Sequence, residues 1–235
     1  NGDGDPLILI ETRDELEEAD AIITALEKEI KLNKRNFSHF AILYRTNAQS
    51  RALEEALRKR NIAYKIYGGL SFYQRKEIKD LLSYYRLTIN HKDEEALKRI
   101  INYPARGIGS TTMQKLTIVA NKMNISIWEV INNIDEINIT INKGTKQKLE
   151  NFTSLINTFK EEIEIENAYT IAEKIAKNSG ILNELYNDKT NEGINRLENI
   201  QELLNGIKTF TDSSEEEKNT LPEFMKEVAL LTNED

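Results

Sequence analysis

The sequence predicts a mixed, mainly α-helical fold, in which a short, incomplete parallel α/β portion is followed by an all-helical subdomain. Before Gly68, short apolar segments alternate with amphipathic helical patterns, and this alternation is typical of a parallel sheet. After Gly69, apolar residues recur only at helical spacing. The predicted sheet therefore holds three strands, with no convincing fourth later in the chain.

The first strand-helix unit is predicted at the start of the chain. Leu7 to Ile10 is an apolar run of strand length. Thr12 and Glu15 have the spacing of a capping box, which opens a helix. The apolar positions that follow have helical spacing and are Leu16, Ala19, Ile23, Leu26 and Ile30.

The second unit begins with Phe40 to Tyr44, an apolar run typical of a buried strand. Thr46 and Gln49 form a second predicted capping box, so a helix starts directly after the strand. Asn61 is a predicted helix stop, and Tyr64 to Tyr67 is the third predicted strand.

The rest of the chain is predicted to be helical, and we place a domain boundary between residues 1–90 and 91–235. Ser126 and Glu129 form a capping box, Gly180 ends a helix, and Pro222 occupies a first-turn position. The acidic run from Asp212 to Lys218 is the best candidate for a disordered loop. Helices are expected at 76–90, 94–101, 111–123, 127–131, 146–165, 168–178, 193–207 and 222–231.

Composition excludes several classes of protein. The 235 residues include no cysteine and only two histidines, His39 and His91, so disulfides and thiolate metal sites are excluded and no metal is expected. No apolar run approaches the length of a membrane span, and the first residues lack the layout of a signal peptide. We expect a cytoplasmic protein with no membrane partner.

Charge is distributed unevenly along the chain. Residues 41–122 hold 16 Lys and Arg against 7 Asp and Glu, a net of +9. The remainder holds 16 against 32, a net of -16. Solvated helix faces can differ in this way by chance, and the alternative is that the basic third carries a nucleic-acid-binding face.

Two motifs in the basic third could contact nucleic acid. In residues 104–112, Gly107 and Gly109 allow close approach of the backbone to a phosphate beside Arg106, but a tight helix-helix turn would also need glycine. In residues 68–80, an aromatic pair precedes Arg75. The pair suits base stacking on single strands, whereas the alternative, which we favour for the rings, is burial in the core.

Catalytic motifs are missing from the sequence. No phosphate-binding G-x-x-x-x-G-K-[ST] loop is present, because Gly144-Thr145-Lys146 has the wrong order and follows no predicted strand. No Ser-His-Asp or Cys-His arrangement can be assembled either. We therefore assign no catalytic residue and no cofactor to this chain.

Three blocks, Phe40 to Ala56, Tyr67 to Leu87 and Asn102 to Gly109, closely resemble the UvrD/PcrA/Rep family of superfamily 1 DNA helicases. The similarity continues weakly through residues 179–181 and 196–203. The resemblance implies part of the second RecA-like lobe (2A), followed by the helical 2B insertion. It also implies that the Walker A and Walker B motifs, with the ATP and Mg²⁺ of the parent helicase, lie outside this sequence.

The resemblance implies a role in ATP-driven 3′-to-5′ translocation and unwinding, in DNA repair or replication, in the nucleoid. This chain alone is expected to lack ATPase activity. Its partners would be duplex DNA and the single-strand junction, the remaining RecA-like lobes, and repair or replication proteins. The alternative is a protein-interaction or autoinhibitory module of the same helicase, with little DNA affinity of its own.

The resemblance also assigns nucleic-acid-binding residues. The family's Gly-Ile-Gly loop resembles a helix-hairpin-helix element that touches duplex backbone. The other blocks place three further residues on the nucleic-acid side, less closely matched to a motif. The full set is Arg106, Gly107, Ile108, Gly109, Thr111, Arg75, Asn47 and Arg51.

Overall fold

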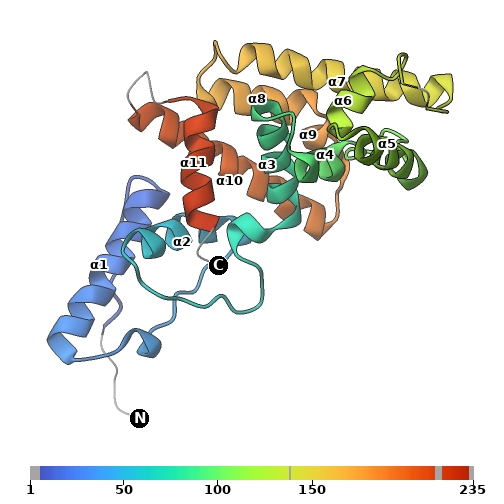
Figure 1. Cartoon of the computed structure of the whole chain (residues 1–235). Helices are drawn as coiled ribbons and strands as arrows, with labels where there is room; N and C mark the ends of the chain where they lie inside the picture. The colour runs from blue at the N-terminus through green and yellow to red at the C-terminus, as the bar shows by residue number, and fades with distance from the viewer. Residues whose placement is uncertain (1–5, 138, 215–218, 233–235) are drawn as a thin grey trace. The chain divides into compact units, whose positions relative to one another are not determined.

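The computed structural model describes residues 6–137, 139–214 and 219–232 (Figure 1). The chain divides into two compact units, Asn1–Phe72 and Tyr73–Asp235. None of the helices described is long and apolar enough to cross a membrane.

The first unit is built on two helices, α1 (Glu15–Asn33) and α2 (Ser50–Lys59), which pack against each other. Two short 3₁₀ turns, η1 (Phe37–His39) and η2 (Asn47–Gln49), lie between them in the chain. Each helix contributes one apolar stripe to the contact. The buried residues of this small core are Ala19, Ile23, Ala52, Leu53, Leu57 and Ile62.

The start of α1 differs from the prediction. Asp14, and not Thr12, caps the helix: its Oδ1 accepts hydrogen bonds from the backbone NH groups of Leu16 (3.1 Å) and Glu17 (2.8 Å). The predicted capping box of Thr12 with Glu15 is therefore wrong. A carboxylate directly before the first helical residue can reach these donors and also favours the positive end of the helix dipole.

The described residues form no β-strand, so the predicted α/β portion is not shown. The three segments predicted as strands, at 7–10, 40–44 and 64–67, have no regular secondary structure. Leu7 and Leu43 are almost fully exposed, whereas Ile42 and Tyr44 pack against the helical core. A strand needs a neighbouring strand for its backbone hydrogen bonds, and no described segment supplies one.

The helix signals around α2 are confirmed. The capping box of Thr46 and Gln49 is present, and Gln49 Oε1 accepts from the backbone NH groups of Arg45 (2.9 Å) and Thr46 (3.0 Å). The capped residues form the 3₁₀ turn η2, from which α2 continues. Asn61 follows the end of α2 with a left-handed φ of 55°, as expected for a helix stop.

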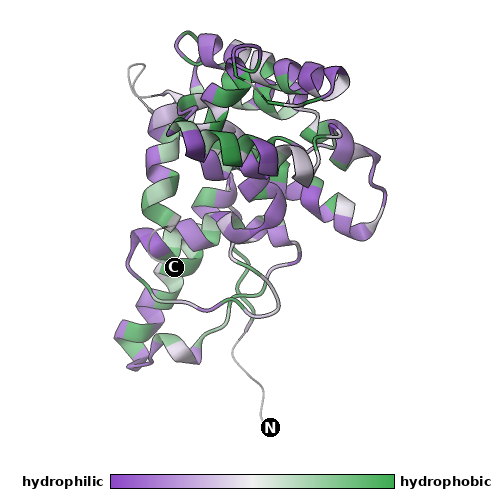
Figure 2. Ribbon diagram, turned by 45° about the vertical axis from the view of Figure 1, so that its right-hand side comes forward, coloured by the Kyte–Doolittle hydropathy of each residue, from purple (hydrophilic) through white to green (hydrophobic). Residues whose placement is uncertain are grey.

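The second unit is helical, and a short 3₁₀ turn, η3 (Phe72–Gln74), leads into it. Figure 2 shows hydrophobic and hydrophilic residues interleaved along its ribbon, as expected for amphipathic helices with one buried face. Its helices are α3 (Lys76–Ile89), α4 (Glu94–Ile100), α5 (Ser110–Met123), α6 (Ile127–Asn132), α7 (Lys143–Glu162), α8 (Ala168–Asn178), α9 (Ile181–Asn187), α10 (Asn191–Ser213) and α11 (Leu221–Thr232).

Helix α3 is the centre of this unit. It contacts α4, α7, α8, α10 and α11, and Leu81, Tyr84, Tyr85 and Leu87 on it are completely buried. Because its apolar surface is covered by helices later in the chain, α3 belongs to the second unit. The two compact units therefore divide before α3. The domain boundary expected after residue 90 stays a prediction.

Three predicted helix signals in this unit are confirmed. Ser126 and Glu129 form the capping box of α6, Gly180 follows α8 with a φ of 91°, and Pro222 is the second residue of α11. The predicted disordered loop at 212–218 is partly wrong, because α10 extends through Ser213. Residues 215–218 lie outside the described part of the chain.

His91, just beyond α3, stacks on Trp128 of α6 with ring centroids 4.2 Å apart. Burial lowers the pKa of His91 below its usual 6.5, and the positive charge of Lys160 lowers it further. Its buried Nε2 has no hydrogen-bond partner among the residues that the structure describes. The folded protein therefore favours the neutral imidazole.

We expect the free energy of unfolding to fall as the pH drops below 6.5 toward the lower pKa of folded His91. The unfolded chain binds a proton in this range that the folded chain resists. Urea unfolding between pH 5 and 8, followed by the fluorescence of Trp128, the single tryptophan of the chain, measures the effect. His91→Gln should remove this part of the pH dependence, and an unchanged dependence in the variant would contradict the assignment.

Candidate nucleic-acid interface

The glycine motif forms a hairpin turn between α4 and α5. Gly107 has a φ of +69°, a left-handed conformation that favours glycine. Ile108, directly after it, is 1% exposed and fixes the turn to the core of the second unit. The turn therefore combines one buried anchor with exposed backbone at Gly107 and Gly109.

Asn102 holds the turn in shape. Its Oδ1 accepts hydrogen bonds from the backbone NH groups of both Arg106 and Ile108, each at 3.0 Å. These two donors flank Gly107, so one side-chain oxygen fixes the backbone on both sides of it. The sequence alone does not assign this role to Asn102, because an asparagine before a turn has many possible local roles.

Several backbone NH groups at the tip of the hairpin have no hydrogen-bond acceptor among the described residues. Within the described residues, no hydrogen bond is made by the NH groups of Gly107, Gly109, Ser110 or Thr111. The last two begin α5, whose N-cap, Gly109, has no side chain with which to cap the helix. Such NH groups at the positive end of a helix dipole suit an anion.

Arg106, one of the residues predicted to bind nucleic acid, also bonds within the protein. Its guanidinium is directed into the second unit, where Nη1 donates to the carbonyl oxygens of Ile100 and Pro104, both at 3.1 Å. Its Nη2 donates to the hydroxyl of Tyr84 (2.7 Å) and the carbonyl oxygen of Ser179 (3.0 Å). Arg106 therefore ties the hairpin to α3 and to the end of α8.

Tyr84 completes this internal network. Burial raises its pKa to about 12, although the charge of Arg106 acts in the opposite direction. The hydroxyl therefore stays protonated at neutral pH and donates to the carbonyl oxygen of Tyr103 at 2.5 Å. The network is neutral apart from the one guanidinium, which four oxygen atoms surround.

Lys148, on α7, is the cation that the fold brings to the tip of the hairpin. Its exposed side chain places Nζ 3.5 Å from the carbonyl oxygen of Gly107. Lys148 is absent from the residues predicted to bind nucleic acid, since it lies on a polar helix face far along the chain from the glycines. No local signal could have found it, because only helix packing makes the two neighbours.

The other predicted residues do not gather at the hairpin. Arg75 is buried and donates from Nη1 to Asn199 of α10 at 2.9 Å. Arg51, in the first unit, is 3% exposed and pairs with Glu55 at 2.8 Å. Asn47 is exposed in η2 of the first unit.

The aromatic pair before Arg75 belongs to the core. Phe72 is completely buried and Tyr73 is 4% exposed. The backbone NH of Phe72 donates to the buried carboxylate of Glu54 at 3.0 Å. The prediction that these rings are core residues is therefore confirmed, and they offer no surface for base stacking.

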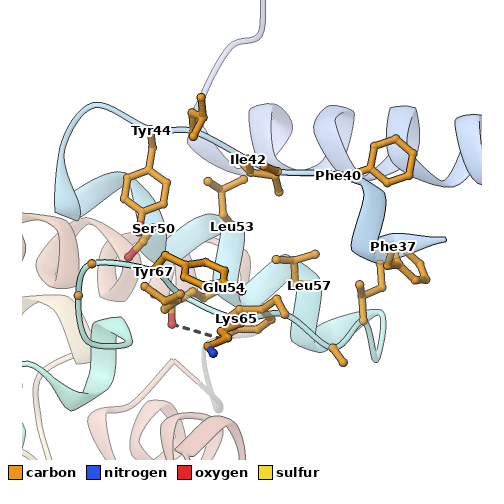
Figure 3. A pocket seen from close by; sticks show the side chains of 18 of the residues that line it. Phe37, Phe40, Ile42, Tyr44, Ser50, Leu53, Glu54, Leu57, Lys65 and Tyr67 are labelled. Carbon is orange, nitrogen blue, oxygen red and sulfur yellow. Dashed lines mark hydrogen bonds between the residues drawn. The ribbon is translucent and has the colours of Figure 1, made fainter. Parts of the chain in front are cut away.

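A groove of about 710 Å³ lies within the first unit. Figure 3 shows that its wall combines apolar side chains of α2, such as Leu53 and Leu57, with Ile42 and Tyr44 of the extended segment. The groove is mostly apolar, and the described residues contain no cluster of acidic and histidine side chains able to hold a metal ion.

Gly107→Ala should destabilise the protein by about 1–2 kcal/mol, because the left-handed conformation disfavours a Cβ. That Cβ would also lie 2.6 Å from Lys148 Nζ, which must move. Urea unfolding measures the change. The matched control is Gly144→Ala inside α7, which should stabilise by about 0.5–1 kcal/mol; equal effects of the two variants would contradict the role of Gly107.

Comparison with known proteins identifies the family. A family model described as "UvrD-like helicase C-terminal domain" matches residues 1–235. The chain is 36% identical over 235 residues to the ATP-dependent DNA helicase PcrA of Staphylococcus aureus (strain NCTC 8325 / PS 47), and equally to that of Staphylococcus epidermidis (strain ATCC 12228 / FDA PCI 1200). The match covers the whole of this chain and only 32% of the length of each relative. The chain thus belongs to the UvrD/PcrA family of superfamily 1 DNA helicases, within its C-terminal domain.

Proposed function

We propose that this chain is the 2A/2B part of an ATP-dependent 3′-to-5′ DNA helicase of DNA repair or replication, and that its glycine hairpin grips the backbone of duplex DNA. The observation that carries the proposal is the set of open backbone donors at Gly107, Gly109, Ser110 and Thr111. Backbone NH groups bind phosphate without reading base sequence, as a helicase acting on any duplex requires.

Charge supports the same surface. The hairpin lies in the basic third of the sequence, and Lys148 adds a cation beside it. A phosphate at the hairpin would meet the open NH groups together with the Lys148 ammonium, and its binding would release counterions. An acidic protein can in this way bind DNA through one local face.

The predicted binding residues take different parts in this proposal. Gly107, Gly109 and Thr111 offer backbone donors, Ile108 anchors the turn, and Arg106 positions it from inside. Asn47 remains in the proposed DNA-facing set because it is exposed. Arg51 and Arg75 would contact DNA only by exchanging their present partners.

The parent activity rests on the relatives, which are named as ATP-dependent DNA helicases and are about three times as long as the matched region. We propose that ATP and Mg²⁺ act in parts of the parent protein other than this chain, in the cytoplasm at the nucleoid. Within that protein, the 2B helices would swivel about the lobe junction and so regulate unwinding.

For the first unit, we propose that the segments at 40–44 and 64–67 belong to the sheet of a RecA-like lobe. Alternate side chains of the first segment already pack on the helices, as in a strand with one covered face. The backbone NH groups of Ile42, Leu43 and Tyr44 make no hydrogen bond within the described residues. The apolar groove beside them would then be covered in the parent protein.

Hydrogen exchange tests the sheet proposal. In the 235-residue chain, the amides of Ile42, Leu43 and Tyr44 should exchange almost unprotected, and in a form extended to the length of the relatives they should slow by at least about a hundredfold. The amide of Leu53 in α2 serves as the control that is protected in both. Equal exchange at Ile42 to Tyr44 in the two forms would contradict the proposal.

The second candidate function is a protein-interaction or autoinhibitory module. The observation that favours it is the net charge of -16 outside residues 41–122, which suits a basic protein surface and repels DNA. The two functions differ in whether the chain binds forked DNA at low salt. Only the DNA grip predicts measurable binding.

We expect the chain to bind a labelled forked duplex at 50 mM salt and to lose about tenfold or more in affinity at 200 mM, measured by fluorescence anisotropy.

Thr111→Glu should weaken binding about five- to tenfold at 50 mM salt, because its carboxylate repels phosphate while favouring the N-terminus of α5. Asn195→Glu on α10 is the matched control. No binding by the wild-type chain would favour the interaction module.

A further inference from the structure

We infer that Asn102 is a DNA-contacting residue of this interface, one whose uncharged amide both shapes the hairpin and binds phosphate. The inference rests on the proposed grip of the hairpin on duplex DNA and assigns the residue on which that grip depends. Neither the composition nor the charge pattern of the sequence points to it.

The two ends of the amide have different surroundings. Its Oδ1 accepts from the NH groups of Arg106 and Ile108 at 3.0 Å each, which uses both lone pairs of the oxygen. Its Nδ2 makes no hydrogen bond to any described residue, although the amide carries two NH donors. The side chain is exposed at this point.

The arrangement adds the Nδ2 of Asn102 to the open backbone NH groups of the hairpin. Arg106 and Ile108 are held by Oδ1, and the next donors in the chain, at Gly107 and Gly109, are open. A phosphate oxygen at the hairpin would therefore meet neutral NH groups from the backbone and from Asn102. Lys148 supplies a full positive charge beside the turn. Lys98 lines the same hollow as Asn102 and Ser110, but its ammonium is paired with Glu94 at 3.0 Å.

Replacements of this side chain decide between a structural role and a binding role. An aspartate at position 102 would still accept both backbone hydrogen bonds and keep the turn. It would remove the Nδ2 donors and place a negative charge beside the open NH groups. That charge would weaken phosphate binding in either role, so a neutral replacement is needed to separate them. Asn102→Ser keeps an oxygen that can accept hydrogen bonds and removes the Nδ2 donors. A purely structural asparagine would tolerate this replacement, whereas a phosphate-binding one would not.

The test uses Asn102→Ser, Asn102→Asp and Asn102→Ala in the 235-residue chain. Asn102→Ser should melt near the wild type and bind the forked duplex about threefold more weakly at 50 mM salt. Asn102→Asp should melt within about 2 °C of the wild type. It should bind the forked duplex about tenfold more weakly at 50 mM salt, with a deficit that shrinks toward 200 mM as salt screens the added charge. Asn102→Ala loses both hydrogen bonds, so its affinity should fall about three- to tenfold by an amount that salt does not change.

Asn195→Asp on the exposed face of α10 controls for net charge and should bind like the wild type. Wild-type affinity of Asn102→Ser at 50 mM salt, with an unchanged melting temperature, would overturn the role of Asn102 while leaving the proposed DNA grip standing. Failure of both the wild-type chain and Asn195→Asp to bind would overturn the grip itself, and the inference with it. If Asn102→Ala does not fold, the comparison of Asn102→Ser with the wild type decides alone.

Discussion

The guanidinium of Arg106 joins three parts of the second unit that are distant in sequence. It donates to oxygen atoms of α4 and the hairpin, to the hydroxyl of Tyr84 on α3, and to the carbonyl oxygen of Ser179 at the end of α8. An arginine carries several donors in a fixed plane, so a single side chain can fix this many acceptors. The position and shape of the proposed DNA-binding turn depend on this cluster.

The cluster also explains why the groups that hold the hairpin in place differ from those that are left to bind phosphate. A buried or half-buried arginine that already bonds four oxygen atoms is costly to withdraw, because each acceptor would lose its partner. The groups left for a phosphate are the open backbone NH groups, the amide of Asn102 and the ammonium of Lys148. The charged guanidinium of Arg106 thus holds the turn from inside the unit, while the hydrogen-bond donors that face outward are mostly neutral.

The first unit shows the opposite situation, in which apolar side chains are left uncovered. Leu43 and Tyr67 are mostly exposed, although the residues that alternate with them pack on α1 and α2. Alternation of this kind is the pattern of a strand with one face on a helical layer. Extended backbone without a hydrogen-bonded neighbour does not become a sheet, which is why the strand pattern and the observed structure differ.

Several features follow directly from the sequence: the helical character of the second unit, the capping boxes at Thr46 and Ser126, the helix stops at Asn61 and Gly180, and the family. These features depend on side chains within a few residues of one another, or on blocks of matching sequence. Tertiary structure alone decided that Arg106 points inward, that Arg51 and Arg75 are paired and buried, and that Lys148 joins the hairpin. The direction of a long charged side chain is set by the acceptors that packing brings near it, and those acceptors come from segments far away in the chain.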